Sequence, residues 1–334
     1  MDTIVGRLAK SRLPKRKMAI VLGYLGTGYQ GIQYNPPAHT IDNELFKALV
    51  ATNCISQSNS DDFSKSSFSR ATRTDKGVHA LTNLVALKMQ RYEVPQQVKA
   101  ELNEILPDDI RIWDVVPVKK KFNARVMAGT RHYRYLIPTF LLQCGPHSDL
   151  STSQLARFKN IWNIFLGTHN YYNFTPRRKD TNADSPQNMR HMYSIQVSDP
   201  FTIAGSTQWL SIAIHGQSFL LHQIRKMVHY ALSEYHRGSS DTKSMELLET
   251  VDPDLTSATA LDTPTEQYIP LAPAAGLYLH HPTFEGYNNQ PAARRLQVLD
   301  LSGYPACATF EDRIHTEIAR SEHVFHEYMA VIRQ

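Results

Sequence analysis

The sequence has 334 residues, of which 42% are hydrophobic, 10% aromatic and 20% charged. This composition can bury a large core and excludes an intrinsically disordered chain. The net charge of +5 favours a polyanionic partner if the cations gather on one face, whereas scattered cations would only keep the protein soluble.

The three cysteines, Cys54, Cys144 and Cys307, lie far apart and form no CxxC pair, so we expect a reducing compartment and no disulfide framework. We also expect no bound metal and no membrane span, because the histidines show no ligand spacing and no apolar run approaches about 20 residues. The N-terminus lacks the order of a signal peptide. The basic segment from Lys10 to Lys17 is interpreted as a nuclear import signal, an RNA-contacting arm or a plain solvated tail.

The first half of the chain alternates strand and helix patterns. Apolar residues with a period of two predict a strand at 17–24, and Thr40 followed by an apolar stripe predicts a helix. After a polar loop, two predicted strands enclose RATRTDKGVHA at 70–80, so Asp75 is expected on the connection between them. The later predictions are a helix at 96–106 and strands at 110–118 and 131–138.

The second half repeats this alternation, which indicates α+β layers. Its predicted elements are a helix at 152–166, strands at 192–199 and 208–215, a long helix from 219 with one broad apolar face, and a terminal helix at 309–332. The polar segment 252–268 is expected to be a surface excursion.

The sequence GTGYQG at 26–31 fits the glycine pattern of a dinucleotide site and follows a predicted strand. Such a site needs a helix directly after the turn, and Pro36 and Pro37 forbid one. We therefore interpret it as a glycine-rich turn beside a nucleic-acid surface. A nucleotide-cofactor enzyme is the alternative, which addition of a dinucleotide in a thermal-shift assay would test.

Asp75 is a single carboxylate among Arg70, Arg73 and Lys76. Turn amides can donate hydrogen bonds to such a side chain, and nearby cations hold it ionised, which suits a nucleophile or a base. The alternative is an aspartate that merely caps its own loop.

Two further segments carry candidate side chains. In RHYRY, Arg131, Tyr133 and Tyr135 share one face of a strand and offer a cation and two rings to an exposed base, unless they form an aromatic ladder against a helix. Arg225 lies at the edge of the apolar face of its helix, where it either reaches over the sheet toward an acid or faces solvent.

Six blocks, in this order along the chain, resemble the TruA-type tRNA pseudouridine synthases, and within them the eukaryotic Pus1 branch. The resemblance covers about residues 17–287. The blocks are YLGTGYQGIQ (24–33), RATRTDKGVHA (70–80), RHYRYLIPTF (131–140), GTHNYYNFT (167–175), GQSFLLHQIRKM (216–227) and AAGLYL (274–279).

The resemblance implies two ferredoxin-like, RRM-resembling halves that share a long antiparallel sheet, with helices on the outer face and a central RNA-binding cleft. On this basis we expect four parts. They are a basic arm at 1–16, an N-terminal half at 17–128 carrying the Asp75 loop, a C-terminal half at 129–300 and a helical extension at 301–334.

The resemblance also implies roles for single residues. Asp75 matches the catalytic aspartate, as acid or nucleophile, and Arg73 the arginine that fills the space left by the flipped uridine. Tyr133 matches a tyrosine that packs on the target base and is proposed as a general base. Arg225 matches the arginine that forms a salt bridge with the aspartate, and Leu277 an apolar residue of the pocket.

The implied activity is the isomerisation of uridine to pseudouridine in tRNA, at several positions and without a cofactor, with small nuclear or messenger RNA as a further substrate class. The alternative is a tRNA-binding or folding protein with little or no catalysis. Lys76, Tyr135, Arg177 and Arg178 are predicted RNA contacts, with Lys119 to Lys121 as further candidates. The nucleus is the expected compartment, ahead of the mitochondrion and the cytoplasm; target uridines, chemical route and oligomeric state stay open.

One local departure concerns the helix that carries Arg225. The family usually has a glycine soon after IRKM, whereas this chain has Val228 and His229. Larger side chains there would crowd the helix against its neighbours, so we expect a local difference in packing.

Overall fold

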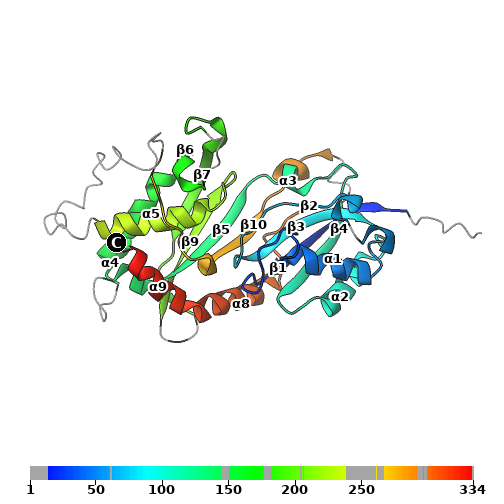
Figure 1. Ribbon diagram of the computed structural model, residues 1–334, viewed down its shortest axis with the longest axis horizontal. Helices are drawn as coiled ribbons and strands as arrows, with labels where there is room; N and C mark the ends of the chain where they lie inside the picture. Colours follow the sequence, from blue (N-terminus) through cyan, green and yellow to red (C-terminus); the bar gives the residue numbers. More distant parts are fainter. Residues whose placement is uncertain are drawn as a thin grey trace, which may run out of the picture.

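The computed structural model describes residues 14–60, 62–143, 150–176, 182–203, 205, 207–237, 261, 267–291, 296 and 299–332. Within these residues, one mixed sheet of ten strands is flanked by helices (Figure 1). The α+β class predicted from the alternation of strand and helix patterns is confirmed.

The described strands are β1 (Arg16–Tyr24), β2 (Ser69–Arg70), β3 (His79–Met89), β4 (Ile110–Pro117), β5 (Arg131–Pro138), β6 (Gly167–Asn170), β7 (Met189–Val197), β8 (Phe201–Thr202), β9 (Gln208–Gly216) and β10 (Leu277–Pro282). Seven of these ten strands lie at predicted segments, and β6, β8 and β10 were not predicted. The order of the strands in the sheet is β4-β1-β3-β10-β5-β9-β7-β6, with β2 paired to β3 and β8 to β9. Each half of the chain therefore supplies one side of a continuous sheet.

The strand β10 joins the two sides. It pairs antiparallel with β5 and parallel with β3, where Tyr278 lies opposite His79 and Leu279 opposite Ala80. The expectation of an antiparallel sheet is thus wrong at this one junction. Since β3 and β5 run in opposite directions, any strand between them must be parallel to one of the two.

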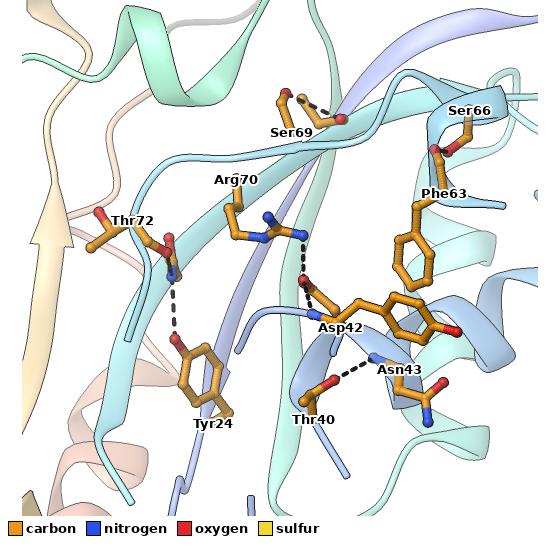
Figure 2. Close-up of polar contacts among 12 residues, drawn as sticks. Tyr24, Thr40, Asp42, Asn43, Phe63, Ser66, Ser69, Arg70 and Thr72 are labelled. Atoms are coloured by element: carbon orange, nitrogen blue, oxygen red, sulfur yellow. Dashed lines mark hydrogen bonds and ion pairs between the residues drawn. The ribbon is translucent and has the colours of Figure 1, made fainter. Parts of the chain in front are cut away.

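The helices are α1 (Ile41–Ala51), α2 (Pro95–Ile105), α3 (Ala124–Met127), α4 (Thr152–Ile161), α5 (Gln223–Arg237), α6 (Glu285–Asn288), α8 (Cys307–Arg320) and α9 (Glu322–Ile332). The predicted N-cap is confirmed, because Thr40 Oγ1 accepts a hydrogen bond from the amide of Asn43 at 3.3 Å (Figure 2). None of the helices in the described ranges has the length and apolarity needed to cross a bilayer.

Three helix predictions differ from the structure. The helix expected at 152–166 ends as an α-helix at Ile161 and continues as a 3-10 helix over Trp162–Phe165. The long helix expected from 219 begins at Gln223, because His222 has a φ of +63°, which lies outside the right-handed helical region. The terminal helix is two helices separated by Ser321. The first of them, α8, packs on the sheet, where Phe310 meets Trp113 edge-on and Glu311 accepts hydrogen bonds from Arg134 and Tyr278.

Candidate active site

A cleft of about 880 Å³ is lined by the β2–β3 connection, the segment that leads into α5, and parts of β5, β7 and β10. The lining residues lie far apart in the sequence, and β10 and β5 bring them together in the middle of the sheet. In the described part of the chain the cleft contains one carboxylate, Asp75. The arginines that line it are Arg70, Arg73, Arg125, Arg131, Arg190 and Arg225. This charge pattern suits a polyanionic ligand.

The glycine-rich turn supports the loop that carries Asp75. The amide of Ile32 donates to the carbonyl of Thr74 at 3.2 Å, and the amide of Gly77 donates to the carbonyl of Tyr29 at 3.3 Å. Gly31 has a φ of +96°, and a Cβ on it would lie 2.7 Å from the carbonyl oxygen of Thr74. The turn therefore requires glycine at this position in order to approach the Asp75 loop.

A buried polar chain ties the same loop to the core of the sheet. The hydroxyls of Tyr24 and Thr74 are hydrogen-bonded at 2.7 Å. The side-chain amide of Asn83 donates both to Tyr24 Oη, at 3.2 Å, and to the carbonyl of Thr72, at 3.0 Å (Figure 2). Residues on either side of Arg73 are thus fixed by β1 and β3, which leaves Arg73 exposed at the cleft.

Arg70 forms its ion pair with Asp42 and not with Asp75, which is nearer in the sequence. Its guanidinium pairs with the buried Asp42 of α1 at 2.5 Å (Figure 2). Burial raises the pKa of Asp42 to about 6, although Arg70 and the amide of Tyr34 both oppose that shift. This ion pair connects β2 to α1 and so fixes one wall of the cleft.

Asp75 itself is accessible, with 32% of its side chain exposed. Among the described residues, the group that forms an ion-pair contact with it is His222, whose Nε2 lies 3.8 Å from Asp75 Oδ2. The expected salt bridge to Arg225 is absent from this structure. Instead, Arg225 Nε donates to the carbonyl of Ala272 at 2.6 Å. Burial lowers the pKa of Arg225, and the charges of Tyr135 and Asp75 oppose that shift.

Tyr133 and Leu277, which the resemblance places at the target base and in the pocket, both line the cleft and are largely buried. The ring of Tyr133 meets Phe219 edge-on at 5.1 Å. Burial raises the pKa of Tyr133 well above its usual value, which Arg131 only partly opposes, so its hydroxyl keeps its proton at neutral pH.

Most of the cleft residues come from the blocks that carried the sequence resemblance, and comparison with known proteins agrees with it. Residues 161–285 match the family model described as tRNA pseudouridine synthase. The chain is 35% identical to tRNA pseudouridine synthase 1 of Saccharomyces cerevisiae, over 88% of this chain and 66% of that protein. It is 32% identical to the tRNA pseudouridine(27/28) synthase of the same yeast, over 94% of this chain and 98% of that protein. The chain belongs to the TruA-type tRNA pseudouridine synthase family.

A third relative is tRNA pseudouridine synthase 1 of Eremothecium gossypii, which is 34% identical over 88% of this chain and 68% of that protein. The chain thus spans about two thirds of the length of the two relatives named tRNA pseudouridine synthase 1.

Within this family member, one predicted RNA contact is wrong. Tyr135 has no exposed surface, and its hydroxyl donates to the carbonyl of Pro273 at 2.7 Å. A ring without exposed surface cannot stack on a base, so Tyr135 is part of the core that supports the site. Its neighbour on the same face, Tyr133, reaches the cleft.

The described lysines that were predicted to contact RNA do not line the cleft. Lys76 is exposed beside Asp75 but does not line the cleft. Lys119 donates to the side-chain oxygen of Gln290 at 2.5 Å, away from the cleft lining. Arg177 and Arg178 lie outside the described residues.

Sequence reasoning missed Arg190 and His222. Arg190, the second residue of the strand β7, lines the cleft and donates to the carbonyl of Gln187 at 2.9 Å. Its buried Nε has no hydrogen-bond partner among the described residues. The helix predicted from 219 includes His222 in its first turn. Neither residue type nor spacing marks these two positions, because their roles depend on how distant strands assemble.

Proposed function

We propose that this protein converts uridine to pseudouridine in tRNA and that the reaction takes place at Asp75. The observation that carries the proposal is the composition of the cleft: one accessible carboxylate among arginines, in a member of a tRNA pseudouridine synthase family. A site that only bound RNA would gain nothing from an acid facing phosphates.

The geometry suits an extracted nucleotide. Cleft arginines hold phosphates, and Arg73, exposed at the cleft, occupies the space that the flipped uridine leaves in the RNA. The uracil ring lies between Tyr133 and Leu277, whose apolar surfaces exclude water. Asp75 then acts on the ribose, either by attack on C1′ or by removal of a 2′ proton, and the bond from C1′ to N1 breaks.

The detached uracil turns and forms a bond from its C5 to ribose C1′, after which the hydrogen on C5 leaves. The mass of the nucleotide is unchanged, and no redox equivalent is consumed. Arg225 lines the same cleft as Asp75, and the carbonyl of Ala272 holds its guanidinium through the hydrogen bond from Nε.

The substrate range and the compartment are part of the proposal. Transfer RNA is the primary substrate, at more than one uridine, and small nuclear or messenger RNA is a further substrate class. Nuclear localisation fits the basic segment from Lys10 to Lys17. Arg177 and Arg178 are proposed phosphate contacts, so changing both to alanine weakens tRNA binding and flattens its salt dependence.

The test separates chemistry from binding. Asp75→Asn keeps the side-chain volume and removes the charge, so we expect no conversion of uridine and a tRNA affinity close to that of the wild type. Nucleoside analysis of the digested tRNA measures conversion, and a filter-binding titration measures affinity. The matched control is Asp312→Asn on the exposed face of α8, which should retain full conversion.

Retained conversion by Asp75→Asn would move the catalytic role to another residue. Tight tRNA binding by the wild type without any conversion would favour the alternative function of a tRNA-binding or folding protein.

A further inference from the structure

The proposed reaction, on which this inference rests, needs a group that accepts the proton leaving C5. That group must line the cleft and be uncharged and basic near neutral pH. Among the described lining residues, the titratable side chains are the six arginines, Asp75, Tyr133 and His222.

Most of these groups are unsuited to the task. Arginine stays protonated, and Asp75 is engaged with the ribose. Tyr133 retains its proton because burial raises its pKa, and a neutral phenol is a weak base. His222 is the one histidine that lines the cleft in the described part of the chain.

The position of His222 is unusual for its residue type. It has a left-handed backbone with a φ of +63°, directly before α5, and its carbonyl accepts the first helical hydrogen bond from the amide of Lys226 at 3.1 Å. Such conformations are costly for residues other than glycine and cluster at functional sites. Here the conformation directs the imidazole to within 3.8 Å of Asp75.

The charges around His222 come from two elements. Burial lowers its pKa, Asp75 from the β2–β3 connection opposes the shift, and Arg225 and Lys226 from α5 reinforce it. The imidazole is therefore neutral at neutral pH, while the adjacent carboxylate stabilises the imidazolium once a proton has been taken up.

His222 also borders a second cavity of about 440 Å³, which shares Thr175 and Pro176 with the main cleft and is lined further by Lys226 and the exposed Tyr268. A side chain that faces both spaces can take a proton on the substrate side and release it to solvent on the other. With 27% of its side chain exposed, His222 meets this condition.

We propose that His222 is the catalytic base that removes the C5 proton after the carbon glycoside has formed. The C5–H bond breaks and its proton passes to Nε2 of His222. The electron pair of that bond becomes the C5–C6 double bond, and the electrons of the N1–C6 double bond move to N1. N1 then takes a proton from water. The imidazolium then returns its proton to solvent.

The test uses the full chain and a variant chosen to fold. His222→Gly suits the left-handed backbone and removes only the imidazole. With wild-type activity established on the same tRNA, we expect pseudouridine formation to fall by about 10²-fold or more. Added imidazole should restore part of the rate. Asp75→Asn, treated with imidazole in the same way, should gain nothing.

Isotopic substitution identifies the step that is affected. Tritium or deuterium at C5 slows only the deprotonation, so a primary deuterium isotope effect should appear in His222→Gly and be absent from Tyr133→Phe. On RNA with 5-fluorouridine at the target position, fluorine cannot leave as a cation and the reaction stops at the carbon glycoside. His222→Gly should therefore consume this RNA at close to the wild-type rate.

The proposal is overturned if His222→Gly keeps wild-type activity. It is also overturned if His222→Gly forms pseudouridine slowly but consumes the 5-fluorouridine RNA equally slowly, or if the isotope effect appears in Tyr133→Phe instead. A wild-type protein that converts no uridine would contradict the proposed function itself, which is a different result from each of these.

Discussion

At the scale of single residues, the site depends on backbone support as much as on the charged groups. Asp75 lies on a loop that the glycine-rich turn holds through the contacts of Gly31 and Ile32 with Thr74. The sequence GTGYQG, which resembles a dinucleotide motif, has this supporting role in the structure. A side chain added at Gly31 would displace the Asp75 loop.

Gly31→Ala should reduce turnover strongly, because the new Cβ meets the Thr74 carbonyl and the φ of +96° is unfavourable for alanine. We also expect a loss of about 1 kcal/mol or more in the free energy of unfolding. The control is Gly28→Ala, where an added Cβ meets no atom within 4 Å. Turnover and denaturant unfolding of both variants test this, and equal activity of the two would contradict it.

Arg190→Ala should weaken tRNA binding uniformly across substrates. Its side chain lines the cleft beside the other cleft arginines, where a phosphate of bound RNA can reach its charge. Loss of one phosphate contact should reduce the slope of log affinity against log salt by about 0.9. Arg320→Ala, on the exposed side of α8, is the control. An unchanged slope for Arg190→Ala would remove it from the RNA-binding surface.

At the scale of elements, α5 connects the site to the C-terminal helices. The departure from the family at Val228 and His229 has a structural counterpart: both are buried, and His229 Nδ1 is hydrogen-bonded to the hydroxyl of Tyr328 on α9 at 2.7 Å. The ring nitrogen on the other side lies 3.2 Å from Ser233 Oγ. The larger side chain thus joins two helices where the family usually has a glycine.

Tyr328→Phe removes this bond and leaves a buried ring nitrogen with one partner fewer. We expect the free energy of unfolding to fall by about 1–3 kcal/mol. Tyr193→Phe on the exposed part of β7 should change it by less than about 0.5 kcal/mol. Denaturant titrations measure both, and a neutral Tyr328→Phe would show that the α5–α9 contact adds nothing to stability.

Three neighbouring strands carry stacked histidines, with His132 on β5 lying 3.9 Å from His215 on β9 and 4.3 Å from His281 on β10 between ring centroids. Burial lowers the pKa of His132 and His281 to about 4; the neighbouring His281 adds to the shift of His132, and the neighbouring His280 adds to that of His281. These two rings therefore bind fewer protons in the folded protein than in the unfolded chain between about pH 6.5 and pH 4.

The contribution of these neutral rings to the free energy of unfolding should consequently be complete above about pH 6.5 and be lost as the pH is lowered toward 4. The expected loss is on the order of 1 kcal/mol per ring after allowance for solvent screening. Thermal unfolding across this pH range measures the effect. His132→Asn should show a shallower dependence than the wild type, and identical curves would contradict the assignment to this stack.

At the scale of the whole molecule, the sequence predicts the elements and the family, whereas their assembly decides the site. Periodicity places Tyr133 and Tyr135 on one face of β5. Only packing decides that Tyr133 lines the cleft while Tyr135 is buried, with its hydroxyl bonded to the carbonyl of Pro273. The parallel pairing of β10 with β3 links segments about two hundred residues apart, which no local pattern encodes.

The motif blocks nevertheless predict correctly that Asp75, Arg73, Tyr133, Arg225 and Leu277 share one cleft. The partner of Asp75 could not be predicted in the same way. The left-handed backbone of His222 interrupts an apolar pattern that continues through it, so the pattern indicates a helix. Arg225, aligned with a salt-bridging residue, is held instead by a carbonyl from the 267–273 segment.

The most direct test of the proposed reaction is the release of tritium from a tRNA transcript labelled at C5 of its uridines, with the wild-type protein and Asp75→Ala in parallel. Formation of the carbon glycoside must expel that hydrogen. We predict release by the wild type, in step with pseudouridine formation, and none by Asp75→Ala. No release by the wild type, despite tight binding to several transcripts, would contradict the proposed function and leave an RNA-binding protein.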